Sequence, residues 1–477
     1  MIKHLIIQIF LLNGQNNKNM NTIKKTSLEY FNEWLDSFLN FEKMPKKNIF
    51  WLDTMNYLCN RFDNPQKEYK AYHIAGSKGK GSVSSYISNI LSSAGYNTGL
   101  YTSPHILNFS ERIRCANNPF PEEIYEQTVK QIVPLVDSII PENLPNQREA
   151  TWFELVTLFA FLTFKNAGCT HCVFETGMGG RLDATNVINP EICIITPIEL
   201  EHTEFLGDTL EKIATEKAGI IKENVPVISF NQKPEVKKVL IEKANEKNCK
   251  IYFLDEFLKS YNYEINNLKS DITLEFNNLF SRPINTTLNF LGEFQVFNAA
   301  LACYACKIIN PEITEEQIEE GLSKAFLPGR FEIIKKNDTK KIPTIIMDGA
   351  HTKDSVTFTF NTFRKLFNNE GKLLFACAYD KNMDEISKLF FEYKFKDIIL
   401  TKPGLEKGSN LPYLIECVKK INDNSNEKVN LQFDENPQKA IFAAFEQVYN
   451  ANEPLLICGS FYLLAEVKRL LQTLQVD

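Results

Sequence analysis

Residues 72–82 read YHIAGSKGKGS, in which an apolar run leads into a turn with three glycines and two lysines. After this turn, apolar residues recur every three or four positions, as they do on the buried face of a helix. A strand, a glycine-rich turn and a helix in this order can bind phosphate, because backbone N–H groups converge on an anion at the helix N-terminus. Lys80 would add positive charge to such a loop, and the Ser82 hydroxyl would face Mg²⁺.

The loop differs from the usual P-loop pattern, G-x-x-x-x-G-K-[ST]. Gly81 stands between Lys80 and Ser82, and the first glycine, Gly76, lies too close to the lysine. Spacing alone therefore leaves two interpretations open, a phosphate-binding loop and a solvated basic turn.

From residue 70 onward, short apolar runs rich in β-branched residues alternate with amphipathic helical patterns, which predicts a parallel α/β sheet. The alternation restarts after residue 334, and 477 residues exceed what one hydrophobic core usually supports. We therefore predict an α/β protein with two domains. A P-loop ATPase domain with a mostly parallel sheet would span residues 21–327, and a smaller Rossmann-like α/β domain would span residues 328–477.

Composition favours small-molecule partners. The chain carries 53 basic and 59 acidic residues, and no run of lysines is dense enough for a nucleic-acid track. Eleven scattered cysteines indicate buried thiols in a reducing compartment, so we expect a cytoplasmic protein. Two C-x-x-C pairs lie in apolar periodic segments and match no zinc-ribbon spacing, so a structural role is favoured over metal binding. They are Cys169 with Cys172 and Cys303 with Cys306.

The first 20 residues are expected to be a non-native or disordered extension, with Met20 as an alternative start. Their apolar stretch LIIQIFLL is too short to span a bilayer and lacks a small-residue cleavage site after it. No later segment reaches the length of a membrane span, so no membrane partner is expected.

Four polar residues stand where predicted strands end. They are Ser103, Glu175, His202 and Asp348. Ligands of doubly wound sheets bind at the carboxyl ends of the strands, so these residues fall on the expected rim.

The loop GSKGKGS resembles that of the Mur ligase superfamily, specifically the branch of folylpolyglutamate and dihydrofolate synthases, whose usual form is G-T-N-G-K-G-S. Further segments look like motifs of that branch and follow its order. These are residues 99–113, 175–188, 206–222, 327–332 and 347–351. The resemblance runs from about residue 50 to the C-terminus.

The resemblance implies a metal site near the loop, with Glu175 and His202 binding Mg²⁺ and with Ser103 and Ser82 close to it. From the residues alone, Glu175 is either a functional carboxylate or a solvated one, and the small side chains of TGMGGR after it suit close approach of a ligand. His202 alone would more often be an ordinary loop histidine. Because imidazole is softer than the ligands Mg²⁺ normally selects, the identity of the metal comes from the resemblance.

Lys217 lies on the apolar face of a predicted helix that begins with a D-x-x-E capping signature, Asp208 and Glu211. From the sequence alone, the Lys217 side chain either extends along the apolar surface toward water or pairs with an acid. The resemblance implies a carbamylated lysine that helps to hold the metal. The implied catalytic residues are thus Lys80, Glu175, His202 and Lys217.

The resemblance also implies an ATP site that both domains form. Without it, Asn298 would be a helix cap or an internal polar residue, and Arg330 a surface arginine. The implied ATP-binding residues are Gly76, Ser77, Lys78, Gly79, Lys80, Gly81, Ser82, Asn298, Arg330, Asp348 and His351. The implied cofactors are ATP and Mg²⁺ at two sites, with K⁺ as a further option.

Four positions depart from the usual motifs of the branch. Lys78 replaces a loop asparagine, Glu201 replaces an aspartate, and Thr352 and Lys353 replace Asn-Pro after His351. No core catalytic group is lost, but the roles of these four residues stay open.

The implied activity is ATP-dependent ligation of L-glutamate to a folate, to dihydropteroate or to both, through an acyl phosphate, by a monomer. Another Mur-type amino-acid ligase is an alternative. Such enzymes usually carry a nucleotide-sugar domain before the loop, for which the 75 residues before Gly76 are too few. A P-loop ATPase or binding module is the second alternative.

Overall fold

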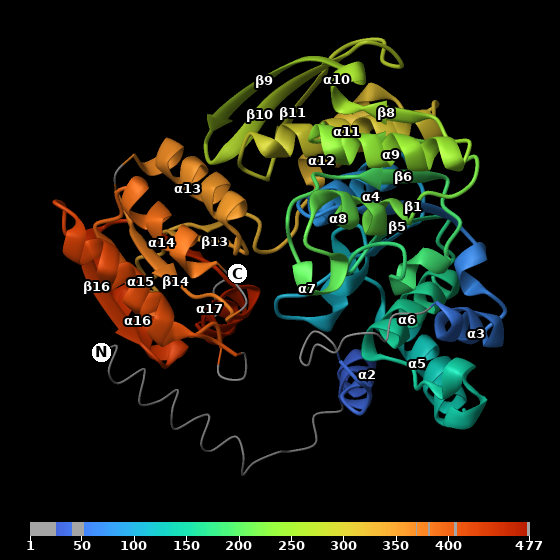
Figure 1. Ribbon diagram of the computed structural model, residues 1–477, viewed down its shortest axis with the longest axis horizontal. Coiled ribbons are helices and arrows are strands. Elements are labelled where there is room, and N and C mark those ends of the chain that lie inside the picture. Colours follow the sequence, from blue (N-terminus) through green and yellow to red (C-terminus); the bar gives the residue numbers. More distant parts are fainter. Residues whose placement is uncertain (1–24, 41–51, 369, 380–381, 405–407, 475–477) are drawn as a thin grey trace.

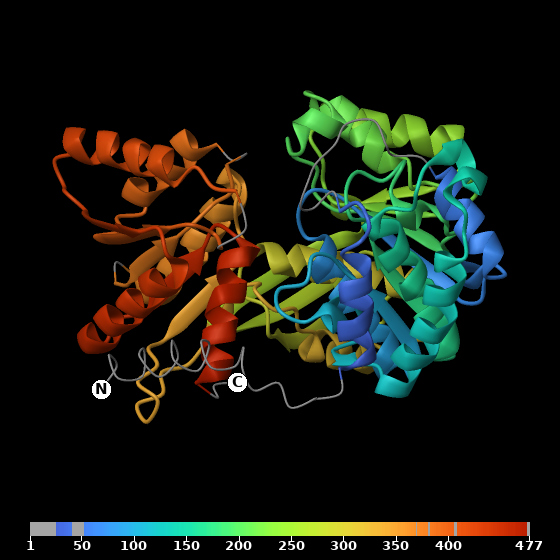
Figure 2. The same cartoon turned by 90° about the horizontal axis from the view of Figure 1, so that it is seen from below.

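The structure is a computed structural model that describes residues 25–40, 52–368, 370–379, 382–404 and 408–474. The expectations for residues 1–20 lie outside this part of the chain. The described chain forms two lobes that lie side by side (Figure 1, Figure 2).

The first lobe is built on an eight-stranded sheet of order β4-β3-β2-β5-β1-β6-β7-β8. β3 pairs antiparallel with both β2 and β4, and the other neighbours pair parallel. The central β1 lies between β5 and β6, so its carboxyl end opens at the middle of the rim. The strands are β1 (Lys70–Ala75), β2 (Thr98–Tyr101), β3 (Ile113–Cys115), β4 (Asn118–Pro119), β5 (His171–Glu175), β6 (Ile192–Ile195), β7 (Val227–Ser229) and β8 (Ile251–Phe253).

Helices bury both faces of this sheet. On one face α4, α11 and α12 form a common apolar core with β1, and α4 and α12 cross so closely that a Cβ on Gly321 would clash with Ile90. α2, α3, α5 and α6 form a second core with β2 and β5, and α8 and α9 form a third with β6 and β7. The helices are α2 (Ser27–Leu35), α3 (Asp53–Arg61), α4 (Lys80–Ser93), α5 (Glu122–Asp137), α6 (Trp152–Asn166), α7 (Thr203–Leu206), α8 (Leu210–Ala218), α9 (Pro234–Glu246), α10 (Leu254–Phe257), α11 (Phe294–Ile309) and α12 (Glu315–Lys324).

A three-stranded antiparallel sheet of order β11-β10-β9 covers the end of α11 and was not predicted from the sequence. Its strands are β9 (Leu258–Asn266), β10 (Lys269–Phe276) and β11 (Ile284–Leu288). β10 alternates buried and half-buried positions, whereas β9 is mostly exposed and polar. The weak apolar signal of β9 explains why the pattern of apolar runs misses this sheet.

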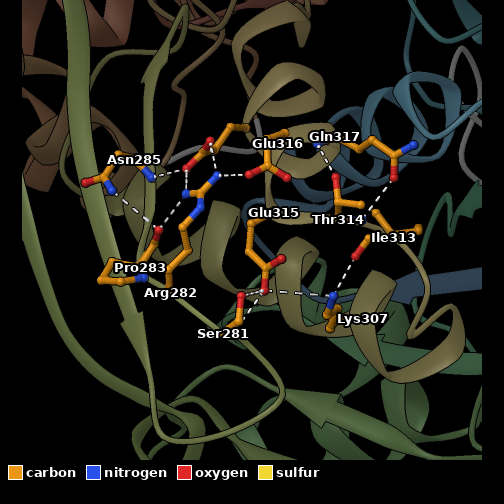
Figure 3. A network of polar contacts seen from close by, with 11 residues as sticks. Ser281, Arg282, Pro283, Asn285, Lys307, Ile313, Thr314, Glu315, Glu316 and Gln317 are labelled. Atoms are coloured by element: carbon orange, nitrogen blue, oxygen red, sulfur yellow. Dashed lines mark hydrogen bonds and ion pairs between the residues drawn. The ribbon is translucent and has the colours of Figure 1, made fainter.

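A polar network ties this sheet to the helices (Figure 3). The Arg282 guanidinium, just before β11, binds the carboxylates of Glu319 at 2.5 Å and Glu316 at 2.8 Å on α12. At the start of α12, Glu315 accepts from the Ser281 N–H at 2.9 Å, and Lys307 of α11 donates to the Ile313 carbonyl at 2.5 Å. The network fixes α11 and α12 against β11.

The second lobe is built on a six-stranded sheet of order β12-β13-β17-β14-β15-β16, in which only the β12–β13 pair is antiparallel. α13, α14 and α15 share one core with the sheet, and α16 and α17 share another. The mixed α/β class and the second α/β unit are as predicted. The elements are β12 (Glu332–Ile334), β13 (Ile345–Asp348), α13 (Lys353–Phe367), β14 (Lys372–Phe375), α14 (Met383–Glu392), β15 (Asp397–Thr401), α15 (Leu411–Asn424), β16 (Asn430–Asp434), α16 (Pro437–Ala451), β17 (Leu455–Cys458) and α17 (Phe461–Thr473).

The chain between the lobes is held from both sides. In the first lobe, the Ser85 hydroxyl and the Arg114 guanidinium donate to the Phe326 carbonyl at 3.2 and 3.3 Å. Three residues later, the Gly329 carbonyl accepts from the Gly349 N–H of the second lobe at 2.9 Å.

All eleven cysteines are free thiols, and nine of them are buried. Each C-x-x-C pair lies in an apolar core of the first lobe. Within the described ranges, no helix has the length and apolar character needed to cross a membrane.

Candidate active site

The turn between β1 and α4 depends on two glycines. Gly79 has a φ of 84° and immediately precedes the first residue of α4. A Cβ on Gly79 would lie 2.6 Å from Asn298 Oδ1, and one on Gly76 would clash with the Thr196 side chain. Only glycine combines this backbone conformation with such close neighbours, so the loop backbone approaches both β6 and α11.

Side chains of the loop fold back onto its own backbone and onto the segment after β6. Lys80 Nζ donates to the Gly76 carbonyl at 3.0 Å. The Ser77 hydroxyl accepts from the Glu199 N–H at 3.0 Å, and the Ser77 N–H donates to the Pro197 carbonyl at 2.8 Å. The loop is therefore anchored before any ligand arrives.

Glu175 closes β5 beside this loop and is only 4% exposed. Its Oε2 accepts from the Ser103 N–H at 3.1 Å, and a Cβ on Gly81 would lie 3.4 Å from the same oxygen. Burial raises the pKa of the Glu175 carboxyl above its ordinary value, while the charges of Lys80 and Arg330 oppose that rise. Glu175 thus faces the first turn of α4, where a bound phosphate would lie.

Lys217 points inward, as the helical pattern predicts, with its side chain 2% exposed. Its ammonium donates to the Gly76 carbonyl at 2.7 Å and to Glu201 Oε1 at 2.9 Å. Burial lowers the pKa of Lys217 to about 8, and Glu201 opposes this shift. The sequence left two interpretations of Lys217 open, and the structure agrees with the one in which Lys217 pairs with an acid, Glu201.

Glu201 also faces the phosphate loop, because Lys78 Nζ lies 3.9 Å from its Oε2. Burial alone would raise the pKa of Glu201, but the charges of Lys217, Lys80 and Lys78 lower it below its ordinary value. Two of the four positions that depart from the usual motifs, Lys78 and Glu201, are therefore ion partners.

The capping prediction for α8 was wrong by one residue. The helix starts at Leu210, and the Thr209 hydroxyl accepts from the Lys212 N–H at 3.3 Å as its cap. Asp208 instead binds the Lys212 ammonium at 2.8 Å. Threonine caps a helix nearly as well as aspartate, so the D-x-x-E spacing alone could not fix the start.

His202 lies directly before α7, exposed to solvent, with a φ of 46°. Its charge contributes to lowering the pKa of the adjacent Glu201. Among the residues that the structure describes, no three or more His, Cys, Asp or Glu side chains gather closely enough to hold a metal ion. That His202 and Glu175 share one metal ion stays a prediction.

The donor set around the loop nevertheless suits a hard cation. The Ser82 hydroxyl and the Glu175 carboxylate are oxygen ligands of the kind Mg²⁺ prefers, and both are buried, at 3% and 4% exposed. Lys217 in its ammonium form repels a cation, so metal binding by this residue requires the predicted carbamate.

In the second lobe, Asp348 ends β13 and orders the backbone around it. Its carboxylate accepts from the N–H groups of Phe331 and Ala350, both at 2.8 Å, and from the Thr359 hydroxyl at 3.1 Å. Burial raises the pKa of Asp348, and the charge of Arg330 opposes this rise. Asp348 therefore orders the turn that carries Arg330.

Arg330 and His351 meet at the same ring. The Arg330 guanidinium lies 4.7 Å from the centroid of Phe461 at the start of α17, and the His351 ring packs edge-on to it at 6.2 Å. His351 Nδ1 also lies 2.7 Å from the Gly349 carbonyl oxygen. Phe461 thus keeps two of the predicted ATP-binding residues together.

A small pocket lies where the two lobes meet. Ser103 and Glu175 line it from the first lobe, Arg330 and Phe461 from the junction and the second lobe. Three of the residues selected from the sequence, Ser103, Glu175 and Arg330, therefore share one pocket although 227 residues separate the first from the last.

Gln295 of α11 was missed by the sequence reasoning. Its side chain lies between Ser82 and Asn298, with Nε2 donating to Ser82 Oγ at 3.3 Å and Oε1 accepting from Asn298 Nδ2 at 3.0 Å. A polar residue three positions before Asn298 in an apolar helix was the signal that could have identified it.

Two family models match the chain. The Mur ligase middle domain matches residues 74–306, and the glutamate ligase domain of Mur ligases matches residues 329–461.

Curated relatives match over most of their length. The chain is 30% identical to the dihydrofolate synthase/folylpolyglutamate synthase of Bacillus subtilis, covering 94% of this chain and 100% of that protein. It is 30% identical to the dihydrofolate synthetase of Saccharomyces cerevisiae, covering 88% and 97%. Among solved structures, folylpolyglutamate synthase of Mycobacterium tuberculosis, complexed with ADP and AMPPCP, superposes with a TM-score of 0.81 at 26% identity, covering 93% of this chain and 98% of that one.

Proposed function

The chain belongs to the family of folylpolyglutamate and dihydrofolate synthases, which are Mur-type ATP-dependent ligases, and from this membership we propose that it joins L-glutamate to a folate, to dihydropteroate or to both. The observation that carries the proposal is the shared pocket of Ser103, Glu175 and Arg330 beside the phosphate loop. A ligase needs a nucleotide and an acceptor in one place, and this pocket lies between the two lobes.

The loop and Lys80 would bind the β- and γ-phosphates of ATP through backbone N–H groups and the ammonium charge. Lys80 and Lys217 already converge on the Gly76 carbonyl, so positive charge is concentrated at the start of α4. Arg330 would bind the γ-phosphate from the other lobe, while Asp348, His351 and Asn298 would position the nucleotide.

Mg²⁺, when bound, would neutralise charge on the terminal phosphate, held by the oxygens of Ser82 and Glu175 with His202, Ser103 and a carbamylated Lys217 as further predicted ligands. A second Mg²⁺ and a K⁺ are part of the same proposal. Glu175 would bind a cation in its ionised form, which the charge of Lys80 favours and burial opposes.

In the proposed reaction a carboxylate oxygen of the folate or pteroate attacks the γ-phosphorus, and the bond from phosphorus to the ADP oxygen breaks. The amine of glutamate then attacks the acyl carbon, inorganic phosphate leaves, and the nitrogen loses a proton to give the amide. The residues of the site act by positioning and charge stabilisation, because none of them forms a covalent bond to the substrate.

The second lobe would complete the site. When the lobes close, Arg330 and Phe461 shield the acyl phosphate from water, which would otherwise hydrolyse it. We expect the enzyme to act as a monomer in the cytoplasm, with a single mass near 54.8 kDa by light scattering.

The test is ADP release by the purified chain with ATP, Mg²⁺ and glutamate, given dihydropteroate or tetrahydrofolate separately, with mass spectrometry of the products. A product heavier by one glutamyl residue with either acceptor supports the proposal, and comparison of the two defines the substrate range. ADP release that needs neither acceptor would identify a plain ATPase. Release that needs a different amino acid would identify another Mur-type ligase.

A further inference from the structure

We propose that Gln295 is a positioning residue that orients the Ser82 hydroxyl and the Asn298 amide for ATP. This inference rests on the proposed function, because it assigns Gln295 a part in the same nucleotide site. Gln295 does not belong to the phosphate loop. It lies on α11 and contacts Ser82 just after that loop.

The side chain of Gln295 is enclosed by the protein, with 2% of the residue exposed. Its two amide ends make different contacts, with the N–H₂ group donating to Ser82 Oγ at 3.3 Å and the carbonyl accepting from Asn298 Nδ2 at 3.0 Å. A buried amide with both ends satisfied is held in one orientation, because rotating it would place donor against donor.

This orientation fixes how Ser82 can bind a ligand. A serine hydroxyl has one hydrogen and two lone pairs. Because one lone pair accepts from Gln295, the second lone pair and the hydrogen remain for a cation and a phosphate oxygen. Without Gln295, the hydroxyl could rotate freely and would lose part of this preference.

Gln295 fixes Asn298 in the same way. Asn298 Oδ1 faces the loop so closely that a Cβ on Gly79 would lie 2.6 Å from it, while Nδ2 donates to Gln295. The amide of Asn298 is thereby held close to the loop at Gly79. One glutamine thus links the first turn of α4 to the residue proposed to position the nucleotide.

The helix that carries Gln295 is itself firmly placed. At its other end, Lys307 donates to the Ile313 carbonyl, and the Arg282 network holds the neighbouring α12 against β11 (Figure 3). A positioning group is effective when its own support does not move. The contact of Lys307 meets this condition at the C-terminal end of α11.

The experiment titrates ATP with Mg²⁺ into the purified full-length chain by calorimetry, with no folate, pteroate or glutamate present. The variants are Gln295→Leu and Gln295→Met, which both remove the two contacts without adding charge, and methionine keeps nearly the length of glutamine. Each is expected to weaken ATP binding by about tenfold or more, because one lost buried hydrogen bond usually costs about a factor of ten and both contacts are lost.

Two controls separate positioning from loss of structure. Gln66→Leu removes another buried glutamine of the first lobe, 5% exposed, and is expected to leave ATP affinity unchanged. In the Ser82→Ala background, Gln295→Leu is expected to cause a smaller loss of ATP affinity, because part of its effect passes through the hydroxyl. In steady-state assays the KM for ATP rises while the KM for glutamate does not.

The proposal is overturned if Gln295→Leu binds ATP like the wild type, or if its loss of ATP affinity is as large in the Ser82→Ala background. If Gln295→Leu does not fold, thermal unfolding shows it, and the uncharged Gln295→Met variant decides in the same two backgrounds. A wild-type chain that binds ATP but ligates no glutamate would reject the proposed function and leave this test intact. A wild-type chain that binds no ATP would reject both.

Discussion

Lys80 and Lys217 donate to the same oxygen, the carbonyl of Gly76, at 3.0 and 2.7 Å. Lys217 also forms an ion pair with Glu201 at 2.9 Å, whereas no carboxylate of the described residues lies within ion-pair distance of Lys80. One lysine is therefore held in an ion pair and the other interacts with backbone, which assigns them different expected roles.

Lys80→Met is expected to abolish most ATP binding with little effect on the fold. Lys217 still donates to Gly76, so the loop keeps that contact, while the phosphates lose a charged partner. We expect ATP affinity to fall by about ten- to a hundredfold, measured by calorimetry. Lys130→Met, at a lysine whose side chain is 71% exposed, is the matched control and should bind ATP normally. Normal ATP binding by Lys80→Met would remove the basis for a phosphate loop.

Glu201→Gln is expected to destabilise the protein, because it leaves the ammonium of Lys217 buried without its counter-charge. Loss of one partner of a buried ion pair costs about 3 kcal/mol of the free energy of unfolding, measured by urea denaturation. Adding Lys217→Met to this variant should recover part of that loss, since the pair is then neutral. If the double variant were less stable than either single one, the pair would not explain the effect.

Glu175→Gln is expected to separate stability from activity. Burial raises the pKa of this carboxyl, so its ionised form at pH 7 is less favourable in the folded chain than in the unfolded one. The neutral amide should therefore raise the unfolding temperature, while ligation falls by about a hundredfold or more because an anionic ligand is lost. When ligation is measured over a range of Mg²⁺ concentrations, the variant should need a higher Mg²⁺ concentration than the wild type to reach half of its maximal rate. A variant with full activity would exclude Glu175 from the site.

Gly79→Ala is expected to impair both stability and nucleotide binding. The new Cβ would be strained at a φ of 84° and would lie 2.6 Å from Asn298 Oδ1. Gly95→Ala, at the end of α4, has a similar φ of 89° but nothing within 4 Å of the new Cβ. Both variants should lose about 1 kcal/mol from backbone strain, but only Gly79→Ala should lose further stability and ATP affinity. Equal effects at the two sites would show that the contact with Asn298 does not matter.

His73 predicts part of the acid sensitivity of the first lobe. It lies within β1 with Nε2 2.8 Å from the Thr185 hydroxyl, and burial lowers its pKa to about 3 from an ordinary value near 6.5. A lowered histidine pKa gives stability that is complete above about pH 6.5 and is lost as the pH falls toward the folded value. Between pH 7 and pH 5 the loss amounts to about 2 kcal/mol.

The variant His73→Gln should remove that share of the pH dependence. Urea denaturation of both proteins at pH 7 and pH 5 is the measurement. The wild type should lose more stability than the variant over this interval. If both proteins lost the same free energy of unfolding between pH 7 and pH 5, protonation of His73 would not destabilise the folded protein.

The parallel strands and the inward face of α8 could be predicted because each depends on a short-range pattern of apolar residues. Lys217 illustrates this, since its orientation follows from helical spacing alone. Its partner does not, because Glu201 lies in an irregular segment whose path depends on contacts with Ser77 and the loop. The ion pair between Lys78 and Glu201 joins residues 123 positions apart, which no local pattern encodes.

Gln295 and β9 were missed for different reasons. Gln295 resembles any polar residue in an apolar helix, and its role depends on the packing of α11 against α4. β9 carries few apolar side chains and is specified mainly by its antiparallel pairing with β10.

Between the two anchored points of the interlobe chain, Phe326 and Gly329, lie two residues, Leu327 and Pro328. Arg330 follows these residues, and Asp348 ties the next residue, Phe331, to the second lobe. The Arg330 guanidinium would therefore move with the second lobe in any rotation of that lobe relative to the first. An anion bound by both Arg330 and Lys80 would hold the two lobes together. Release of the cleaved phosphate would then allow the lobes to separate. The phosphate transferred from ATP would therefore also determine when each turnover ends.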